Sequence, residues 1–251
     1  VTSSAQTAKI GFNALEMSIY AGLIGIAIIM VMMLVGYRIM GVAADIALAL
    51  YVILIVAAMA LIGSTLTLPG IAGIVLSIGM AVDANIIIFT RIKEEIVNGR
   101  TIRAAVKTGF KRAMSTVIDS QVTTLIAAVI LYQVGTSSVK GFAWTLMLGI
   151  IASIFTAVVV TQLYLNIIAG TKTFGKNKFF GIKDDGTIAF SIKRYFPFIK
   201  RRKIFYVISV AVIAAGFMVG GIRGLNYGID FTGGTMMQFD MGRQVATEEV
   251  K

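Results

Sequence analysis

The sequence predicts an all-α protein that crosses a membrane several times. Hydrophobic residues make up 57% of the 251 residues and charged residues only 14%, and the mean hydropathy is +0.89. A soluble domain of this length carries about 25% charged residues. Apolar runs recur along the chain, and most approach the roughly 20 residues that a helix needs to cross the hydrocarbon layer. The expected fold is therefore a helical membrane bundle.

Six apolar segments qualify as spanning helices. They are 17–37, 46–62, 66–89, 115–134, 142–169 and 204–222. The second segment is the shortest. A content of 26 glycines and two prolines also suits helices that pack in a bilayer better than it suits a sheet protein.

The basic residues predict the orientation of these spans. Of 23 Lys and Arg residues, 18 fall on one side: seven in 91–112, ten in 172–203, and Arg38. Because Lys and Arg concentrate on the cytoplasmic side of membrane proteins, we expect this side to be cytoplasmic and both chain ends to be extracytoplasmic. The net charge of +11 is then a topology signal. Nucleic acid is not an expected partner, since the aromatic residues are not arranged as a stacking platform.

These segments predict a division of the chain. Residues 1–16 form an extracytoplasmic lead-in, 17–169 a five-span membrane domain, 170–203 a cytoplasmic basic linker, 204–222 a further span, and 223–251 the start of an extracytoplasmic α+β domain. The linker alternates aromatic and basic residues in "SIKRYFPFIKRRK", so anionic lipids are its expected ligands. Because the N-terminus lacks the basic region of a signal peptide, we expect the chain to be a segment of a longer protein.

One aspartate interrupts the third span. Asp83, in "GMAVDAN", is the only charged residue of 66–89. It lies beside a stripe of small residues at helical spacing, namely Gly70, Gly73, Ser77, Ala81 and Ala84. Such stripes let helices approach closely, so Asp83 is expected to face the bundle. Ionisable residues inside a membrane mark ion pathways by default, and a carboxyl group there can take up and release a proton. The alternative is a neutral packing residue, hydrogen-bonded to Asn85 or to a neighbouring hydroxyl.

The remaining acidic residues give weaker signals. Asp119 lies near hydroxyl residues of the fourth span, close to its cytoplasmic end, where it is either a second relay residue or a solvated interface residue. Asp45 and Glu16 are interpreted as residues at span edges.

The residue types that are missing narrow the chemistry. The chain has no cysteine and no histidine, which excludes disulfides and thiolate metal sites and leaves proton chemistry to carboxylates. No nucleophile–base pair, nucleotide-binding loop or metal cluster is visible, so no enzymatic activity, metal or cofactor beyond a coupling ion is expected.

Long stretches of the chain resemble one known family. "LTLPGIAGIVLSIGMAVDANIIIFTRIKEE" and "GRTIRAAVKTGFKRAMSTVIDSQVTTLIAAVILYQVG" resemble the membrane part of SecD, and "LNYGIDFTGGT" resembles the opening motif of SecF. The resemblance covers roughly residues 10–240 and implies a SecDF-type chain in which both halves are fused. It implies a fold related to the RND exporters, in the bacterial cytoplasmic membrane, with five spans of the first half and one span of the second.

The resemblance also implies a function and a set of site residues. The family uses the proton-motive force to assist polypeptide export, and its proton pathway includes the aspartate that corresponds to Asp83, with Asn85 as a supporting polar residue. Its charged counterparts belong to later spans of the second half. The coupling ion is expected to be the proton, with sodium left open. A structural turn at the membrane surface is expected from Gly228, Asp230, Gly233 and Gly234 of "GIDFTGGT".

The expected partners are the Sec translocon channel, its accessory membrane subunits, and unfolded preprotein on the outer face. The chain departs from the family pattern at two places: Thr90 replaces the glutamate of "FERIREE", and "VIDSQVTT" replaces "ILDANITT". Two other functions remain open. One is an RND-type exporter of a small molecule or lipid, and the other is a non-transporting scaffold for the translocon or an insertase.

Overall fold

The computed structural model describes residues 8–171, 177–182, 199 and 201–224. Within this part, six helices are long and apolar enough to cross a membrane, which confirms the predicted number. The chain divides into two units, residues 12–191 and residues 1–11 with 192–251. The described part of the second unit is dominated by one helix, α7 (Arg202–Arg223).

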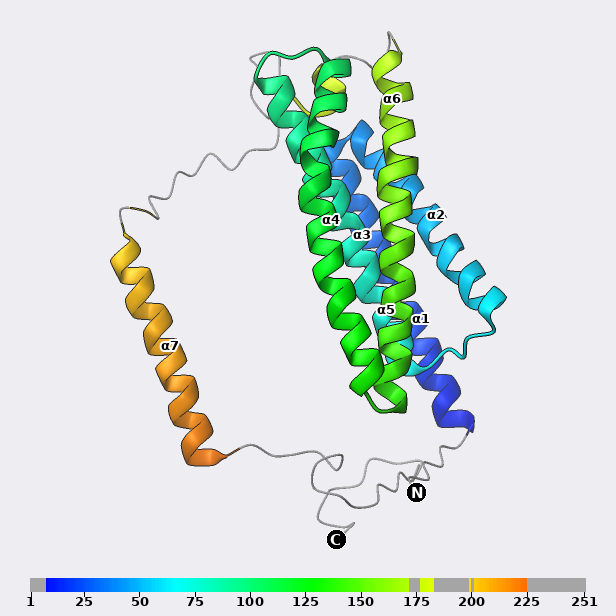
Figure 1. The fold of residues 1–251 in the computed structure, drawn as a ribbon, viewed down its shortest axis with the longest axis vertical. Helices are drawn as coiled ribbons and strands as arrows, with labels where there is room; N and C mark the ends of the chain where they lie inside the picture. Colours follow the sequence, from blue (N-terminus) through cyan, green and yellow to red (C-terminus); the bar gives the residue numbers. More distant parts are fainter. Residues whose placement is uncertain (1–7, 172–176, 183–198, 200, 225–251) are drawn as a thin grey trace. The chain divides into compact units, whose positions relative to one another are not determined.

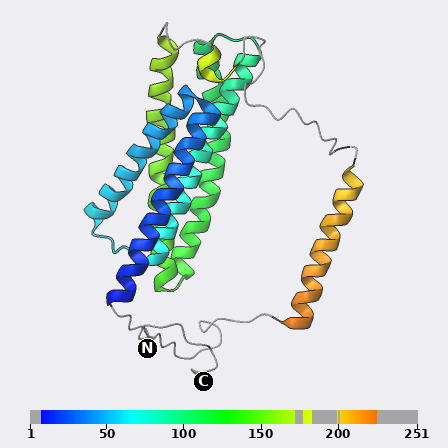
Figure 2. The same ribbon diagram turned by 180° about the vertical axis from the view of Figure 1, so that it is seen from behind.

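The first unit is a bundle of long helices (Figures 1 and 2). In chain order they are α1 (Ala8–Tyr37), α2 (Ile39–Ile62), α3 (Leu68–Val97), α4 (Ile102–Val134), α5 (Ser137–Phe155) and α6 (Gln162–Gly170). A π-helical segment, η1 (Thr156–Thr161), joins α5 to α6 so that they form one continuous rod, and a short 3-10 helix, η2 (Asn177–Phe180), follows. Helices α3, α4 and α5 pack against one another, and α2 packs against η1, α5 and α3.

Several helices extend beyond the predicted apolar runs, including α1, which begins at Ala8 instead of residue 17. Helix α2 begins at Ile39 instead of residue 46, while α3 continues to Val97 and α4 begins at Ile102. The basic segment 91–112 is therefore mostly helical, because polar residues continue a helix once it has left the hydrocarbon. Local signals set two of the starts: the hydroxyls of Thr67 and Thr101 accept hydrogen bonds from the backbone of the first turns of α3 and α4.

The α3–α5 contact confirms the predicted small-residue stripe. Gly70 and Gly73 of α3 lie against Thr145 of α5, whose hydroxyl donates to the Gly70 carbonyl at 2.9 Å. Gly149 lies against Ser77, and a Cβ on Gly149 would collide with the Ser77 side chain. Because lipid provides no hydrophobic drive between helices, close backbone approach through small residues is what holds such a pair together.

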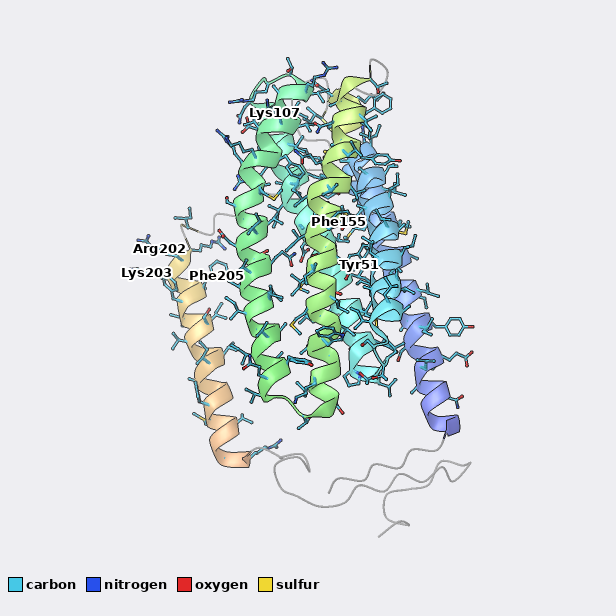
Figure 3. All side chains as sticks on the ribbon, turned by 45° about the vertical axis from the view of Figure 1, so that its right-hand side comes forward. Tyr51, Lys107, Phe155, Arg202, Lys203 and Phe205 are labelled. Carbon is cyan, nitrogen blue, oxygen red and sulfur yellow. The ribbon has the colours of Figure 1, made fainter. Side chains whose placement is uncertain are left out.

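Helix α2 is attached to this pair by one buried polar contact. The Tyr51 hydroxyl lies 2.5 Å from the Ser77 hydroxyl, beside Gly149. Tyr51 is fully buried and lies in the middle of the bundle (Figure 3). A buried hydroxyl in a membrane bundle needs such a partner, so this contact fixes the height of α2 relative to α3.

A sharp elbow joins α1 to α2. Arg38, between the two helices, has a φ of 53°, which is unusual for a residue other than glycine. A Cβ on Gly41 would collide with the Met33 backbone, so glycine permits the close approach of the two helices. The Arg38 side chain donates to the Lys178 carbonyl at 2.7 Å, which ties η2 to the elbow.

Lys93 of α3 supports the same elbow from inside. Only 6% of this residue is exposed. Its ammonium group donates to the Gly36 carbonyl at 3.1 Å and lies 4.2 Å from the centre of the Tyr37 ring. A cation at the end of a helix satisfies the last carbonyls and interacts favourably with the helix dipole. Lys93 therefore caps α1 from a neighbouring helix.

The turn between α3 and α4 is held by a buried carboxylate. The Glu95 side chain is 4% exposed and pairs with Arg100, at 2.7 Å, and with Arg112. Lys107, on the same end of α4, is exposed (Figure 3). Glu95 thus ties the end of α3 to the turn and to the first part of α4.

We expect Gly149→Ala to destabilise the bundle. The new methyl group would push α3 and α5 apart, and overpacking of this kind costs about 1–3 kcal/mol. Thermal unfolding of the complete protein in detergent should show a lower midpoint. Gly79→Ala is the matched control on α3, because a Cβ there meets nothing within 4 Å. An unchanged midpoint for Gly149→Ala would contradict the described contact.

We expect Glu95→Gln to loosen the α3–α4 turn. The paired arginine side chains are 46% and 61% exposed, so solvent screens them and the loss should be about 1 kcal/mol, less than for a fully buried pair. Trypsin cleavage after Arg100 should become about fivefold faster. Glu94→Gln is the control, since Glu94 forms only an exposed i,i+3 pair with Arg91, and equal rates for both variants would refute the anchoring role.

Candidate ion-coupling site

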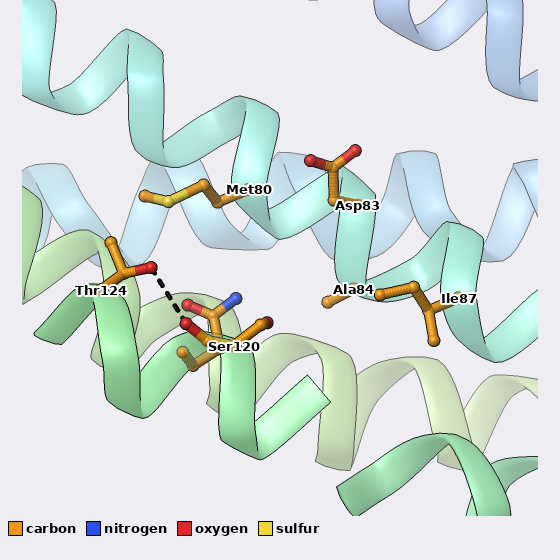
Figure 4. A pocket seen from close by; sticks show the side chains of 7 residues that line it. Met80, Asp83, Ala84, Ile87, Ser120 and Thr124 are labelled. Carbon is orange, nitrogen blue, oxygen red and sulfur yellow. Dashed lines mark hydrogen bonds between the residues drawn. The ribbon is translucent and has the colours of Figure 1, made fainter. Parts of the chain in front are cut away.

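Asp83 lies at a cleft between α3 and α4. The cleft has a volume of about 210 Å³. Its lining residues are Met80, Asp83, Ala84, Ile87, Ser120, Gln121 and Thr124 (Figure 4). Asp83 is exposed at this cleft. The structure therefore places Asp83 at the edge of this cleft, with its carboxylate directed away from α4 and not enclosed by the first unit (Figure 4).

Helix geometry explains this position. Successive residues are rotated by about 100° around a helix, so neighbours of the small-residue stripe do not share its direction. Ala84 and Ala81 are buried, whereas Asp83 projects from the side of the stripe. Asp83 is therefore at the same level of α3 as the stripe, as expected. Its side chain is exposed, however, and does not share the buried face of the stripe.

Asn85 points in another direction and does not pair with Asp83 in the described structure. It is 3% exposed, and its Oδ1 accepts a hydrogen bond from the Thr161 hydroxyl at 2.9 Å. Thr161 ends the π-helical segment η1 and also lies 3.3 Å from the Thr156 carbonyl. The wider π-helical turn changes the register of α6 relative to α5. Asn85 thus attaches α3 to this register change, and its supporting role toward Asp83 stays a prediction.

Gln121 is a polar residue of the cleft that sequence reasoning missed. It is 4% exposed, and its Oε1 is buried without a hydrogen-bond partner in the described part of the chain. The available signal was an amide inside the apolar run of the fourth span, at the place where the family pattern "ILDANITT" has asparagine. The departure at "VIDSQVTT" therefore preserves an amide and lengthens it by one methylene group.

Asp119 is not brought to this cleft. It is exposed on α4 and is not among the lining residues, although Ser120 and Gln121 directly follow it. A relay role for Asp119 stays a prediction.

Asp45 departs from the interpretation as a residue at a span edge. Because α2 begins at Ile39, Asp45 lies well inside the helix. It is 7% exposed, and neither carboxyl oxygen has a hydrogen-bond partner among the described residues. The predicted second span, 46–62, began one residue after Asp45 and therefore did not reveal this burial.

Other predicted features are not tested by the described structure. Gly228, Asp230, Gly233 and Gly234 lie outside the described residues, as does the start of the predicted α+β domain, so both stay predictions. Among the residues that the structure describes, no group of three or more His, Cys, Asp and Glu side chains could hold a metal ion.

Two family models match the chain, and both describe SecD/SecF proteins. Residues 4–169 match the family model "Protein export membrane protein SecD/SecF, C-terminal", and residues 220–245 match the model "SecD/SecF GG Motif". The chain is 38% identical over 260 residues to the protein translocase subunit SecDF of Bacillus subtilis, covering 99% of this chain. It is 52% identical over 174 residues to the protein translocase subunit SecD of Acidaminococcus fermentans, covering 69% of this chain.

Solved structures agree with this grouping. A crystal structure of SecDF from Thermus thermophilus, described as a translocon-associated membrane protein, superposes with a TM-score of 0.76 at 33% identity and covers 88% of this chain. A SecDF crystal structure in a super-membrane-facing form gives a TM-score of 0.73 at the same identity. The fold is thus the RND-like membrane fold of that group, in the segment that the chain covers.

The chain spans only part of these relatives. It covers 35% of the Bacillus subtilis protein, 42% of the Acidaminococcus fermentans protein and 29% of the Thermus thermophilus chain. The matched models nevertheless include the helical unit and the motif after α7. This chain belongs to the SecD/SecF family of protein export membrane proteins.

Proposed function

We propose that the chain is part of an accessory subunit of the Sec protein translocase that uses the proton-motive force to assist polypeptide export. The names of its relatives, protein translocase subunits SecD and SecDF, support the transport role. The observation that carries the ion-coupling part is Asp83, a carboxylate in the middle of a spanning helix that opens onto a polar cleft. A carboxyl group in that position can bind a proton from one side and release it to the other.

The packing of α3 suggests how protonation could act on the rest of the protein. Helix α3 is held against α5 by small residues, and through Lys93 it supports the elbow between α1 and α2. Adding or removing a charge at Asp83 changes the electrostatic environment of α3 and of the α4 residues across the cleft. Because a rigid helix transmits a small rotation along its whole length, the elbow would respond to the charge state of Asp83.

The partners and location follow from the same proposal. The subunit is a multi-pass protein of the bacterial cytoplasmic membrane, in which the α3–α4 turn and residues 170–203 are cytoplasmic and both ends of the chain are extracytoplasmic. Its partners are the translocon channel, accessory membrane subunits and emerging preprotein. Anionic lipids are the proposed ligands of the basic linker, because clusters of Lys and Arg attract anionic headgroups.

We expect Asp83→Asn to abolish gradient-driven export by the complete protein, because the amide cannot exchange a proton. Export into vesicles should be measured with the pH and sodium gradients imposed separately, at equal membrane levels of the protein. Glu94→Gln is the control, since Glu94 forms an exposed pair at the cytoplasmic end of α3. Normal export by Asp83→Asn would favour the scaffold function, and dependence on sodium alone would replace the proton as the coupling ion.

We expect single cysteines to report the proposed orientation. The chain has no cysteine, so Lys107→Cys and Lys140→Cys each introduce one thiol. Both positions are exposed. Position 107 is near the start of α4 and position 140 is near the start of α5, which follows the far end of α4. A membrane-impermeant thiol reagent added outside intact cells should label position 140 and spare position 107. The reverse pattern would invert the proposed topology.

A further inference from the structure

The cleft beside Asp83 contains a buried acceptor that lacks a donor. The atom is Oε1 of Gln121. A buried polar atom without a partner is costly and uncommon in folded proteins. In the described part of the chain, the only other such side-chain atoms are the two carboxyl oxygens of Asp45 on α2. The cleft therefore favours any hydrogen-bond donor that can reach Gln121.

The hydroxyl groups that line the cleft do not supply this donor. The Ser120 hydroxyl donates to the Val117 carbonyl at 3.1 Å, and the Thr124 hydroxyl donates to the Ser120 carbonyl at 2.9 Å (Figure 4). A hydroxyl group has one proton to donate, and both protons are already used within α4. These side chains present only lone pairs to the cleft.

Asp83 is the titratable side chain of the cleft. In Figure 4 its carboxylate points away from Ser120 and Thr124. That direction suits the ionised form, which has only acceptor oxygens and gains nothing from the lone pairs of the two hydroxyls. A protonated carboxyl group instead carries one O–H donor. Rotation about χ1 of Asp83 would move this donor from the outer side of α3 toward α4.

We propose that Gln121 Oε1 accepts the hydrogen bond of the protonated Asp83 carboxyl group and so holds the neutral side chain in the α3–α4 cleft. The inference rests on the proposed function, since it concerns the same ion-coupling residue. A proton passes from a hydronium ion to an Asp83 carboxylate oxygen, which leaves water and a neutral carboxyl group. The new O–H bond is then directed at Gln121.

Gln121 is on this account a positioning residue. Its amide also carries two N–H donors, which an ionised carboxylate could use, but the buried atom without a partner is the oxygen. Protonation therefore changes the partner of Asp83 as well as its charge. The side chain faces outward when it is ionised and toward α4 when it is neutral, so proton uptake becomes a movement between two helices.

Two other species could occupy the cleft and interact with Gln121 Oε1. The cleft volume of about 210 Å³ is ample for ordered water, since one water molecule needs a cavity of about 10–15 Å³. A sodium ion bound by the cleft oxygens is the second. Both predict that the infrared signal of protonated Asp83 is independent of Gln121, which makes them distinguishable from the proposal.

The test is infrared difference spectroscopy of the complete protein between acidic and neutral buffer. The C=O stretching band of the protonated Asp83 carboxyl is identified by its loss in Asp83→Asn. We expect Gln121→Leu to move this band to higher frequency, because the O–H bond loses its acceptor, and to reduce gradient-driven export about two- to tenfold. Gln121→Asn should restore the band position, since it keeps the amide.

Thr123→Val is the matched control. Thr123 is exposed on α4, donates to the Ser120 carbonyl at 2.8 Å and does not line the cleft, so the band should not move. A band that stays in place in Gln121→Leu, that is absent from the wild type, or that responds to sodium at constant pH would overturn the proposal. If Asp83→Asn abolishes export while the Gln121→Leu band stays in place, only this inference fails. If Asp83→Asn exports normally, the proposed function fails first.

Discussion

The close contact between α3 and α5 is the constraint on which the described structure depends. Glycines at positions 70, 73 and 149 remove the side chains that would separate the two backbones. This contact sets the rotation of α3 about its own axis in the described structure. Asn85 then faces Thr161 on the inner side, and Asp83 lies exposed at the edge of the cleft beside α4. The position of the candidate ion-coupling carboxylate is a consequence of packing between small residues that carry no chemistry.

The helix ends near the α3–α4 turn and the α1–α2 elbow add a second set of fixed points. Lys93 caps the end of α1, and Glu95 holds the α3–α4 turn through two arginines. Lys93 and Glu95 are two residues apart on α3 and point in different directions. The same part of α3 therefore contacts both the α1–α2 elbow and the connection between α3 and α4. Any rotation of α3 that follows a change of charge at Asp83 is therefore felt at both places. This arrangement suits the proposed coupling of an ion to a conformational change.

Sequence reasoning predicted the elements whose causes are local. Hydropathy gave the number of spans, and the three- and four-residue spacing of small residues gave the buried face of α3. It did not give the start of α2, because Arg38 and Gly41 form an elbow that depends on contacts with Met33 and Lys178. As a result, Asp45 was assigned to a span edge although it is buried.

The candidate site was predicted only in part for a related reason. Asp83 is recognisable because a lone charge in an apolar run is unusual on its own. Gln121 and Asn85 are uncharged amides, and their importance arises from what lies opposite them, on α3 for Gln121 and on η1 for Asn85. A pairing of Asp83 with Asn85 is natural along the sequence, but two residues apart on a helix point about 200° apart. Partners of that kind become visible only when the neighbouring helices are placed.

The measurement that tests this account most directly is the aqueous access of positions 83 and 85. In the complete protein, Asp83→Cys and Asn85→Cys would each be exposed to a small, water-soluble thiol reagent, with the single introduced cysteine as the only one in this chain. The account predicts rapid labelling at position 83, which opens onto the cleft, and protection at position 85, which is packed against Thr161. Protection at 83 with labelling at 85 would mean that α3 is rotated differently, and the α3–α4 cleft could not be the ion-coupling site.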